Sequence, residues 1–252
     1  QMRARTGRKK EDFWLMGEVI HGDYSRYIQD GQKMLHSVTN YELHKGLYSG
    51  HNDHNYFEIA HTIRREFDEN GGIYRGMKLY SFVDNHDVDR IASKLQDQAC
   101  LIPVHALLYF LPGIPSVYYG SEFGISGRKE GGNDAPLRPA LSLKELEKEA
   151  PHPELAEWIR QMSKIRRKHP ACTEGRYREL LLTNRQYAFC RYSDSDYLLV
   201  AVNNDPQETE VQIPVEGAFT YINVLTKEEA PVENGRAAVK LPACGCVLLE
   251  RV

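Results

Sequence analysis

The 252-residue sequence lacks a long apolar run, a disulfide framework and a strong excess of one charge. A helix that crosses a membrane needs about 20 consecutive apolar residues, and no stretch approaches that length. The formal net charge is −3 and the basic stretch Arg3–Lys10 is short, so nothing indicates binding to nucleic acid. We therefore expect neither a membrane nor a nucleic acid as a partner.

The five cysteines do not form a pattern typical of disulfide-bonded or metal-binding proteins. Their number is odd, and Cys100 lies in an apolar helical run, where it is expected to be a small buried hydrophobic residue. One residue separates Cys244 from Cys246, whereas the cysteines of a zinc knuckle or redox pair have two residues between them. These features indicate a reducing compartment and predict a cytoplasmic protein. No signal peptide is visible, but the first residues read as an internal segment, so secretion stays open.

Strands and helices alternate along the first 172 residues, which predicts an α/β domain with a parallel sheet. The predicted strands are Phe13–Gly17, Met34–Leu43, Leu79–Val83 and Ile114–Tyr119, and the predicted helical segments are Tyr24–Asp30, Asp53–Asp68, Leu95–Phe110 and Pro153–Lys168. We expect Asp23 or Ser25 to cap the first helix, and Asn52 or Asp53 the second. Pro103 either kinks the third helix or marks its true first turn.

The remaining residues, 173–252, show short apolar segments separated by turn signals, which predicts an antiparallel β-sandwich. The predicted strands are Tyr177–Leu182, Tyr187–Tyr192, Tyr197–Val202, Thr209–Ile213, Thr220–Val224, Ala237–Leu241 and Cys246–Leu249. The chain therefore divides into residues 1–172 and residues 173–252.

Polar side chains follow two of the predicted parallel strands. Glu18 comes after the first strand, and Asp84, Asn85, His86 and Asp87 come after the third. Active sites of parallel α/β folds are built at these strand ends, although an Asx-rich turn is a simpler explanation for one such cluster. Glu18 and Asp87 are 69 residues apart, which fits two strand–helix units of roughly 30 or more residues each.

These segments resemble motifs of the α-amylase family of glycoside hydrolases. Gly17-Glu18-Val19 resembles the fifth-strand motif, and Phe82–Asp87 resembles the seventh-strand motif. Gly113–Gly120 is similar to the eighth strand. The resemblance implies the last four βα units of a (β/α)8 TIM barrel, followed by an all-β antiparallel sandwich domain.

The resemblance also implies roles for the site residues. Glu18 would be the general acid/base, Asp87 would hold the sugar in its distorted form, and His86 would contact the same ring. We expect Asn85 to bind substrate beside them. His21 is either a substrate contact or an ordinary loop histidine, and Arg90 either steadies a carboxylate of the site or bridges to solvent. The long polar connector between residues 120 and 141 is interpreted as a lid or a cleft wall.

The nucleophile of a retaining glycosidase, a carboxylate about 5 Å from the acid, has no counterpart here. The family carries it in a motif ending in Arg-x-Asp, which this sequence lacks. Asp12 precedes its strand, and Asp23 lies beyond the loop. The chain thus resembles a fragment of a parent that hydrolyses α-glucosidic bonds of starch or maltooligosaccharides with retention. We expect the chain alone to be inactive.

Alternative interpretations and partners remain. A non-catalytic amylase-like module could bind carbohydrate or another protein. A metallohydrolase site of Glu18, His86 and Asp87 lacks a second histidine, and His51, Asp53 and His54 are better explained as a polar helix start. We expect no metal and no cofactor in this chain, although the full-length parent leaves room for a structural calcium. The open strand edges of a half-barrel predict pairing with the missing half, self-association or a tolerated open side.

Overall fold

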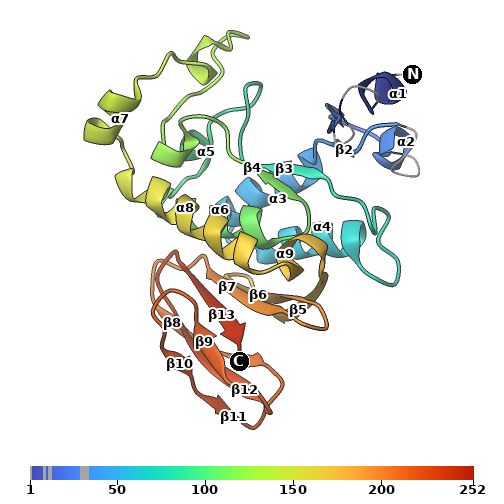
Figure 1. Cartoon of the computed structure of the whole chain (residues 1–252). Coiled ribbons are helices and arrows are strands. Elements are labelled where there is room, and N and C mark those ends of the chain that lie inside the picture. The colour runs from blue at the N-terminus through green and yellow to red at the C-terminus, as the bar shows by residue number, and fades with distance from the viewer. Residues whose placement is uncertain (1, 8–9, 11–12, 29–33) are drawn as a thin grey trace.

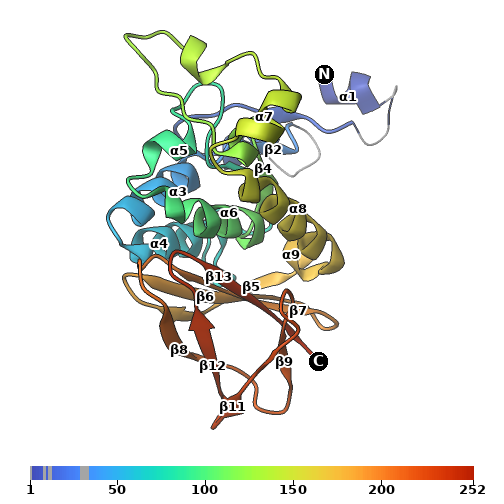
Figure 2. The same ribbon diagram turned by 90° about the vertical axis from the view of Figure 1, so that its left-hand side faces the viewer.

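The computed structural model describes residues 2–7, 10, 13–28 and 34–252 (Figure 1). An α/β unit forms one layer of the molecule, and an antiparallel β domain lies beneath it (Figures 1 and 2). Among the described helices, none has both the length and the apolar character needed to cross a bilayer.

Four short parallel strands organise the α/β unit. They are β1 (Met16–Gly17), β2 (Ser37–Val38), β3 (Tyr80–Phe82) and β4 (Ile114–Ser116). β1 pairs with β2 and β3 pairs with β4, and a parallel bridge between Thr39 and Tyr80 joins the two pairs. The backbone N–H of Asn40 donates to the carbonyl of Tyr80 at 2.8 Å across the same junction. The predicted half-barrel is therefore confirmed, with strands shorter than the sequence indicated.

The predicted strand Met34–Leu43 is wrong in its last part. Only Ser37–Val38 forms a strand, and Tyr41 begins the helix α3 (Tyr41–Asn52). The side chain of Asn40 accepts a hydrogen bond from the N–H of Leu43 at 2.9 Å and caps this helix. The apolar spacing of Val38, Tyr41 and Leu43 imitates a strand, but the cap at Asn40 turns the chain into a helix.

The next helix, α4 (Tyr56–Phe67), begins three residues later than predicted. Neither expected cap is used there. The side chain of Asn52 instead donates to the carbonyl of Lys94 and accepts from the N–H of Gln96, both at 2.9 Å. The cap prediction fails because tertiary partners engage Asn52.

Further helices of the described residues complete the α/β unit. They are α1 (Met2–Gly7), α2 (Ser25–Ile28), α5 (Ile91–Lys94), α6 (Leu101–Phe110), α7 (Leu143–Glu149), α8 (Pro153–Lys168) and α9 (Ala171–Glu174), with 3-10 turns at Gln98–Cys100, Ser121–Phe123 and Ala135–Leu137. Asp23 caps α2, accepting from the N–H of Ser25 at 3.0 Å. The predicted end of this helix, residues 29–30, lies outside the described residues. Pro103 lies in the first turn of α6, where a proline amide is not missed.

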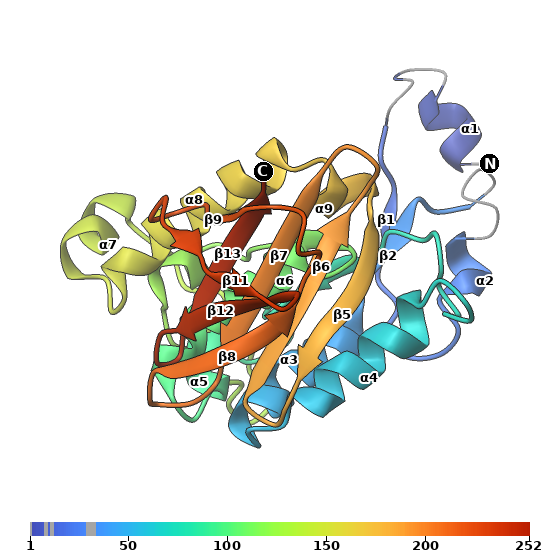
Figure 3. The ribbon, with the colours of Figure 1, turned by 90° about the horizontal axis from the view of Figure 1, so that it is seen from below.

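Two antiparallel sheets form the C-terminal domain (Figure 3). Its strands are β5 (Arg176–Leu182), β6 (Gln186–Tyr192), β7 (Tyr197–Asn203), β8 (Thr209–Pro214), β9 (Tyr221–Asn223), β10 (Glu229–Ala230), β11 (Val232–Glu233), β12 (Arg236–Leu241) and β13 (Cys246–Arg251). One sheet has the order β10-β9-β13-β7-β6-β5, and the other has the order β11-β12-β8. Asn234 and Gly235, both with positive φ, form the tight β11–β12 turn. The predicted antiparallel domain is confirmed.

The six-stranded sheet has a buried face on each side. Tyr187, Phe189, Leu198 and Val200 point into the core shared with the helices above, whereas Ala188, Leu199 and their neighbours point into the core between the sheets. All seven residues of β7 are buried, which explains why Tyr197–Asn203 reads as an almost continuous apolar run. The predicted boundary at residue 172 falls within α9.

Arg191 of β6 fixes the sheet to the α/β unit. This buried arginine donates from Nη1 to the carbonyl of Phe110 at the end of α6 (3.2 Å) and from Nη2 to the carbonyl of Gly175 (3.0 Å). Burial lowers the pKa of Arg191 to about 10, which leaves the side chain charged at neutral pH. The contacts satisfy carbonyls that would otherwise be buried without a donor.

Replacing Arg191 with methionine is expected to lower the free energy of unfolding by about 2–4 kcal/mol, because those carbonyls lose their donors. Urea unfolding followed by circular dichroism measures the change. The matched control is Arg178→Met. Arg178 lies on the neighbouring strand, is half-exposed and forms a long ion pair of 3.8 Å with the exposed Glu216. The control should stay within about 0.5 kcal/mol of wild type. Equal stability of both variants would show that Arg191 does not hold the junction.

Candidate active site

Two acidic residues from different strands meet at one rim of the half-barrel. Glu18 follows β1, and Asp87 lies in the loop after β3, so both occupy carboxyl ends of parallel strands. Three atoms lie within 4.8 Å of one another: a carboxylate oxygen of Glu18, a carboxylate oxygen of Asp87 and a ring nitrogen of His86. The Nε2 of His86 is 3.3 Å from the Oδ2 of Asp87. The structure thus brings together the three residues that the motifs singled out.

Glu18 is exposed and held by one hydroxyl group. Tyr41 donates to the Oε1 of Glu18 at 2.9 Å, and the Nδ2 of Asn85 donates to the same Tyr41 oxygen at 3.1 Å. Burial raises the pKa of Tyr41 to about 12, so this phenol remains a donor at neutral pH. Sequence reasoning missed Tyr41 because it placed this residue in a strand instead of the first turn of α3.

The loop after β3 is shaped by its own polar side chains. The Oδ1 of Asn85 accepts from the N–H groups of Asp87 (2.8 Å) and Val88 (3.1 Å), which is an Asx turn. Asp84 is buried and accepts from the hydroxyl of Ser121 (2.7 Å) and the N–H of Ile91 (2.8 Å). Burial raises the pKa of Asp84. The hydrogen bonds of Asp84 and Asn85 therefore shape the loop, and the loop presents His86 and Asp87 at the rim. The Asx turn and the candidate site are parts of the same loop.

Arg90 is not exposed at the rim, so it does not bridge to solvent, and its predicted role as a substrate-binding residue does not fit its position. Its side chain is completely buried. Nη1 donates to the carbonyl of Tyr119 at 2.7 Å and to the hydroxyl of Ser121 at 3.3 Å, and the guanidinium carbon lies 4.2 Å from the ring centre of Tyr118. The chain turns inward at the start of α5, so Arg90 points beneath the rim and supports the segment after β4.

Arg138 is a site residue that sequence reasoning missed. It lies in the long connector after β4, and its Nη2 is 2.7 Å from the Oδ1 of Asp87. Its Nε donates to the carbonyl of His86 at 3.0 Å, and Asp134 lies 3.4 Å from Nη2. The only sequence signal was an arginine in a polar connector of unusual length. The contact agrees with the interpretation of this connector as part of the cleft wall.

A hollow of about 690 Å³ lies at this rim. Its lining includes Asp87, Tyr41, Ile20, Lys129 and the exposed His21. The volume lies within the range of small-molecule sites in proteins. His21 is therefore placed where a substrate contact is feasible.

The described residues contain no third carboxylate that converges with Glu18 and Asp87. Asp12 lies outside the described residues, and Asp23 is engaged in capping α2. The metal-binding alternative would use the same three residues, Glu18, His86 and Asp87. However, Arg138 already places a positive charge against Asp87, which opposes the binding of a cation there.

Comparison with known proteins relates both parts of the chain to amylases. Residues 1–178 match the family model for the alpha amylase catalytic domain, and residues 177–248 match that for the maltogenic amylase C-terminal domain. A cyclomaltodextrinase from Geobacillus thermopakistaniensis is 22% identical over 98% of this chain and 41% of its own length. A maltogenic alpha-amylase from Bacillus acidopullulyticus is 24% identical over 94% of this chain and 40% of its own length.

Solved structures show the same fold. The alpha-amylase from Geobacillus thermoleovorans, complexed with acarbose, has a TM-score of 0.81 at 19% identity and is matched over 99% of this chain and 56% of that one. A cyclomaltodextrinase structure has a TM-score of 0.82 at 21% identity, matched over 99% of this chain and 42% of that one. The chain thus spans about two fifths of the length of the curated relatives named above.

Proposed function

Because the chain belongs to the alpha-amylase family, whose catalytic-domain model it matches over residues 1–178, we propose that it supplies one half of a glycosidase active site. The complete enzyme hydrolyses α-glucosidic bonds of starch or maltooligosaccharides with retention. The observation that carries this proposal is the convergence of Glu18 and Asp87 within 4.8 Å at the rim of a hollow. A carboxylate pair at this spacing can act on one sugar ring.

Glu18 is the proposed general acid and base. It protonates the leaving glycosidic oxygen and later removes a proton from the attacking water. Tyr41 occupies only Oε1 of Glu18 in this structure, which leaves Oε2 available to the substrate. The hydroxyl of Tyr41 also fixes the orientation of the carboxylate, because Asn85 holds it from the other side.

Asp87 is the proposed stabiliser of the positive charge that develops on the sugar ring, and His86 hydrogen-bonds a ring hydroxyl. Such contacts contribute a few kcal/mol each in sites of this kind. Arg138 orients the carboxylate of Asp87 through the 2.7 Å ion pair. His21 and Asn85 lie at the same rim and are proposed to contact the neighbouring part of the substrate.

The proposed partner of this chain is the first half of the barrel, which would carry the nucleophile. Within the described structure, β1 pairs only with β2, and β4 pairs only with β3. Phe13 and Trp14, just before β1, are each 44% exposed, and Met16 within β1 is 37% exposed. Large apolar side chains beside an unpaired strand edge are typical of a surface that another element covers.

The purified chain is expected to release no nitrophenol from 4-nitrophenyl maltoside above background, because no third carboxylate of the described residues converges with Glu18 and Asp87. Joined to the first half of an amylase barrel in one polypeptide, hereafter the assembled enzyme, it should turn this substrate over. Turnover by the chain alone that Glu18→Gln abolishes would show that the chain supplies a nucleophile of its own, while supporting Glu18 as the acid. Turnover by the assembled enzyme that Glu18→Gln leaves intact would refute the proposed acid.

A carbohydrate-binding module without catalytic activity is the second candidate. The hollow at the rim favours it, together with the lack of a third converging carboxylate among the described residues. Calorimetric titration with maltotriose distinguishes the two functions. Binding to an assembled enzyme that never hydrolyses the sugar would favour the module, whereas binding with turnover would exclude it.

A further inference from the structure

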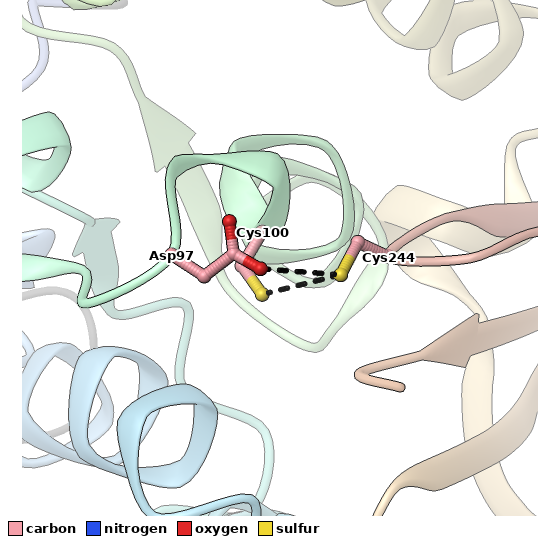
Figure 4. A group of neighbouring side chains, drawn as sticks. All are labelled: Asp97, Cys100 and Cys244. Atoms are coloured by element: carbon pink, nitrogen blue, oxygen red, sulfur yellow. Dashed lines mark hydrogen bonds between the residues drawn. The ribbon is translucent and has the colours of Figure 1, made fainter. Parts of the chain in front are cut away.

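A second group of reactive side chains converges at the junction of the two domains (Figure 4). Asp97 precedes the 3-10 turn Gln98–Cys100 and Cys100 is its last residue, and Cys244 lies in the turn between β12 and β13. The two cysteines are 144 residues apart in the sequence. The junction therefore brings together a carboxylate and two thiols that no local motif joins.

The spacing of these side chains fits a bound metal ion better than a disulfide. The sulfur atoms of Cys100 and Cys244 are 3.8 Å apart, and the Sγ of Cys244 is 3.9 Å from the Oδ2 of Asp97. A disulfide requires a sulfur–sulfur distance of about 2.05 Å. Two thiolates bound tetrahedrally to zinc at 2.3 Å each lie about 3.8 Å apart. The three ligand atoms also lie within 4.8 Å of one another, so one ion can reach them all.

The backbone at Cys244 supports a specific use of this thiol. Cys244 has a φ of 41°, in the left-handed region that L side chains rarely adopt. A glycine would adopt this φ without strain. The N–H of Cys244 donates to the carbonyl of Asp205 at 2.9 Å, which holds the strained turn in place. The fold thus maintains a costly conformation that directs the thiol toward Cys100.

The surroundings provide room for an ion. A cavity of about 240 Å³ is lined by the three side chains and by His54, whose Nδ1 is buried without a hydrogen-bond partner in the described structure. His51 also lines it but is already engaged, because its ring nitrogens lie 2.6 Å from the carbonyl of Leu47 and 3.2 Å from the hydroxyl of Tyr56. One histidine nitrogen beside the cavity is therefore uncommitted.

We propose that Asp97, Cys100 and Cys244 form a site for a thiophilic divalent cation, zinc by its ligand set, that clamps the C-terminal domain to the barrel half. The fourth coordination position opens onto the cavity that His54 also lines. The site is separate from the rim, so no step of the proposed hydrolysis passes through it.

Titration of the metal-free chain with Co²⁺ and Zn²⁺ tests the site. We expect one ion per chain and a thiolate-to-cobalt charge-transfer band. Cys100→Ser and Cys244→Ser should each remove the band, and Asp97→Asn should weaken zinc binding roughly tenfold or more. Asparagine at position 97 can still accept the N–H of Ala99, which Asp97 now accepts at 2.9 Å, so the turn is preserved. Cys172→Ser is the control, because Cys172 is a buried free cysteine in α9.

Zinc should also raise the melting temperature of the wild type and of Cys172→Ser, but not that of the two ligand-cysteine variants. Absence of binding, or an identical cobalt band in Cys244→Ser, would overturn the proposal. Loss of two titratable thiols from the wild type without bound metal would also overturn it, because the pair would then be a disulfide. If the cysteine variants do not fold, unchanged zinc affinity in Asp97→Asn is the contradicting result.

Discussion

Replacing Glu18 with glutamine is expected to lower the kcat of the assembled enzyme by about 10²–10⁴-fold, the usual contribution of a general acid/base. The physical reason is that an amide cannot donate a proton to the leaving oxygen. KM for a maltooligosaccharide should change little, because glutamine keeps the shape of the side chain and an oxygen that accepts from Tyr41.

Asp87→Asn should cause a loss of similar size, and the double variant should lose less than the product of the two single effects, because both groups act on one sugar. The control is Asp23→Asn, which removes a carboxylate from the loop after Glu18 while asparagine still caps α2. Steady-state kinetics on maltotriose measure all four variants. Loss of activity in the control, or full activity in Glu18→Gln, would contradict the assignment.

Glu66 of α4 is expected to make the folded state less stable as pH rises from about 4.5 to about 8. Its carboxyl group is completely buried, Asn40 donates to Oε2 at 2.7 Å, and Oε1 has no partner in the described structure. Burial raises the pKa of Glu66 to about 8 from its ordinary value of 4.5. Between these values the folded state holds a proton that the unfolded state has lost, so unfolding becomes easier as pH rises.

Glu66→Gln should remove this dependence and raise the free energy of unfolding at pH 8 by up to about 4 kcal/mol, taking 1.36 kcal/mol per pKa unit. Glutamine still offers an oxygen to Asn40 and needs no deprotonation. Urea unfolding at pH 5, 7 and 9 measures the difference between variant and wild type. Equal pH dependence in the two proteins would refute the assignment of Glu66.

Three buried histidines make the folded state more stable as pH rises, which opposes the effect of Glu66. The pH dependence of unfolding in Glu66→Gln is therefore compared with that of the wild type. Burial lowers the pKa of His44 to about 3, and of His51 and His105 to about 4. Their stabilising effect grows as pH rises to about 6.5 and is the same in both proteins. The control is Glu58→Gln on the same helix, where the carboxylate pairs with the exposed Lys45.

The sequence predicts the elements whose signals are local and periodic. The apolar stripe of α8, the strands of the C-terminal domain and the polar residues after β3 all follow from residue spacing within a short window. The family motifs add the order of the strands, so the half-barrel and the pairing of Glu18 with Asp87 could be expected. The strand predicted over Met34–Leu43 failed because a single cap at Asn40 outweighs an alternating apolar pattern.

Contacts between distant residues could not be predicted. Arg138 reaches Asp87 across 51 positions, and Cys100 meets Cys244 across 144. Neither pair has a local spacing rule, since the path of the connector and the docking of the two domains decide both. Arg90 shows the converse error, because an arginine next to a catalytic motif can turn beneath the rim instead of toward the ligand.

The central claim is that Glu18 and Asp87 act on one sugar unit. A crystal structure of the assembled enzyme with maltotriose tests it most directly. We expect a glucose ring in the hollow, with the carboxylates of Glu18 and Asp87 both within hydrogen-bonding distance of that ring or its glycosidic oxygen. Maltotriose bound elsewhere, with neither carboxylate in contact, would contradict it.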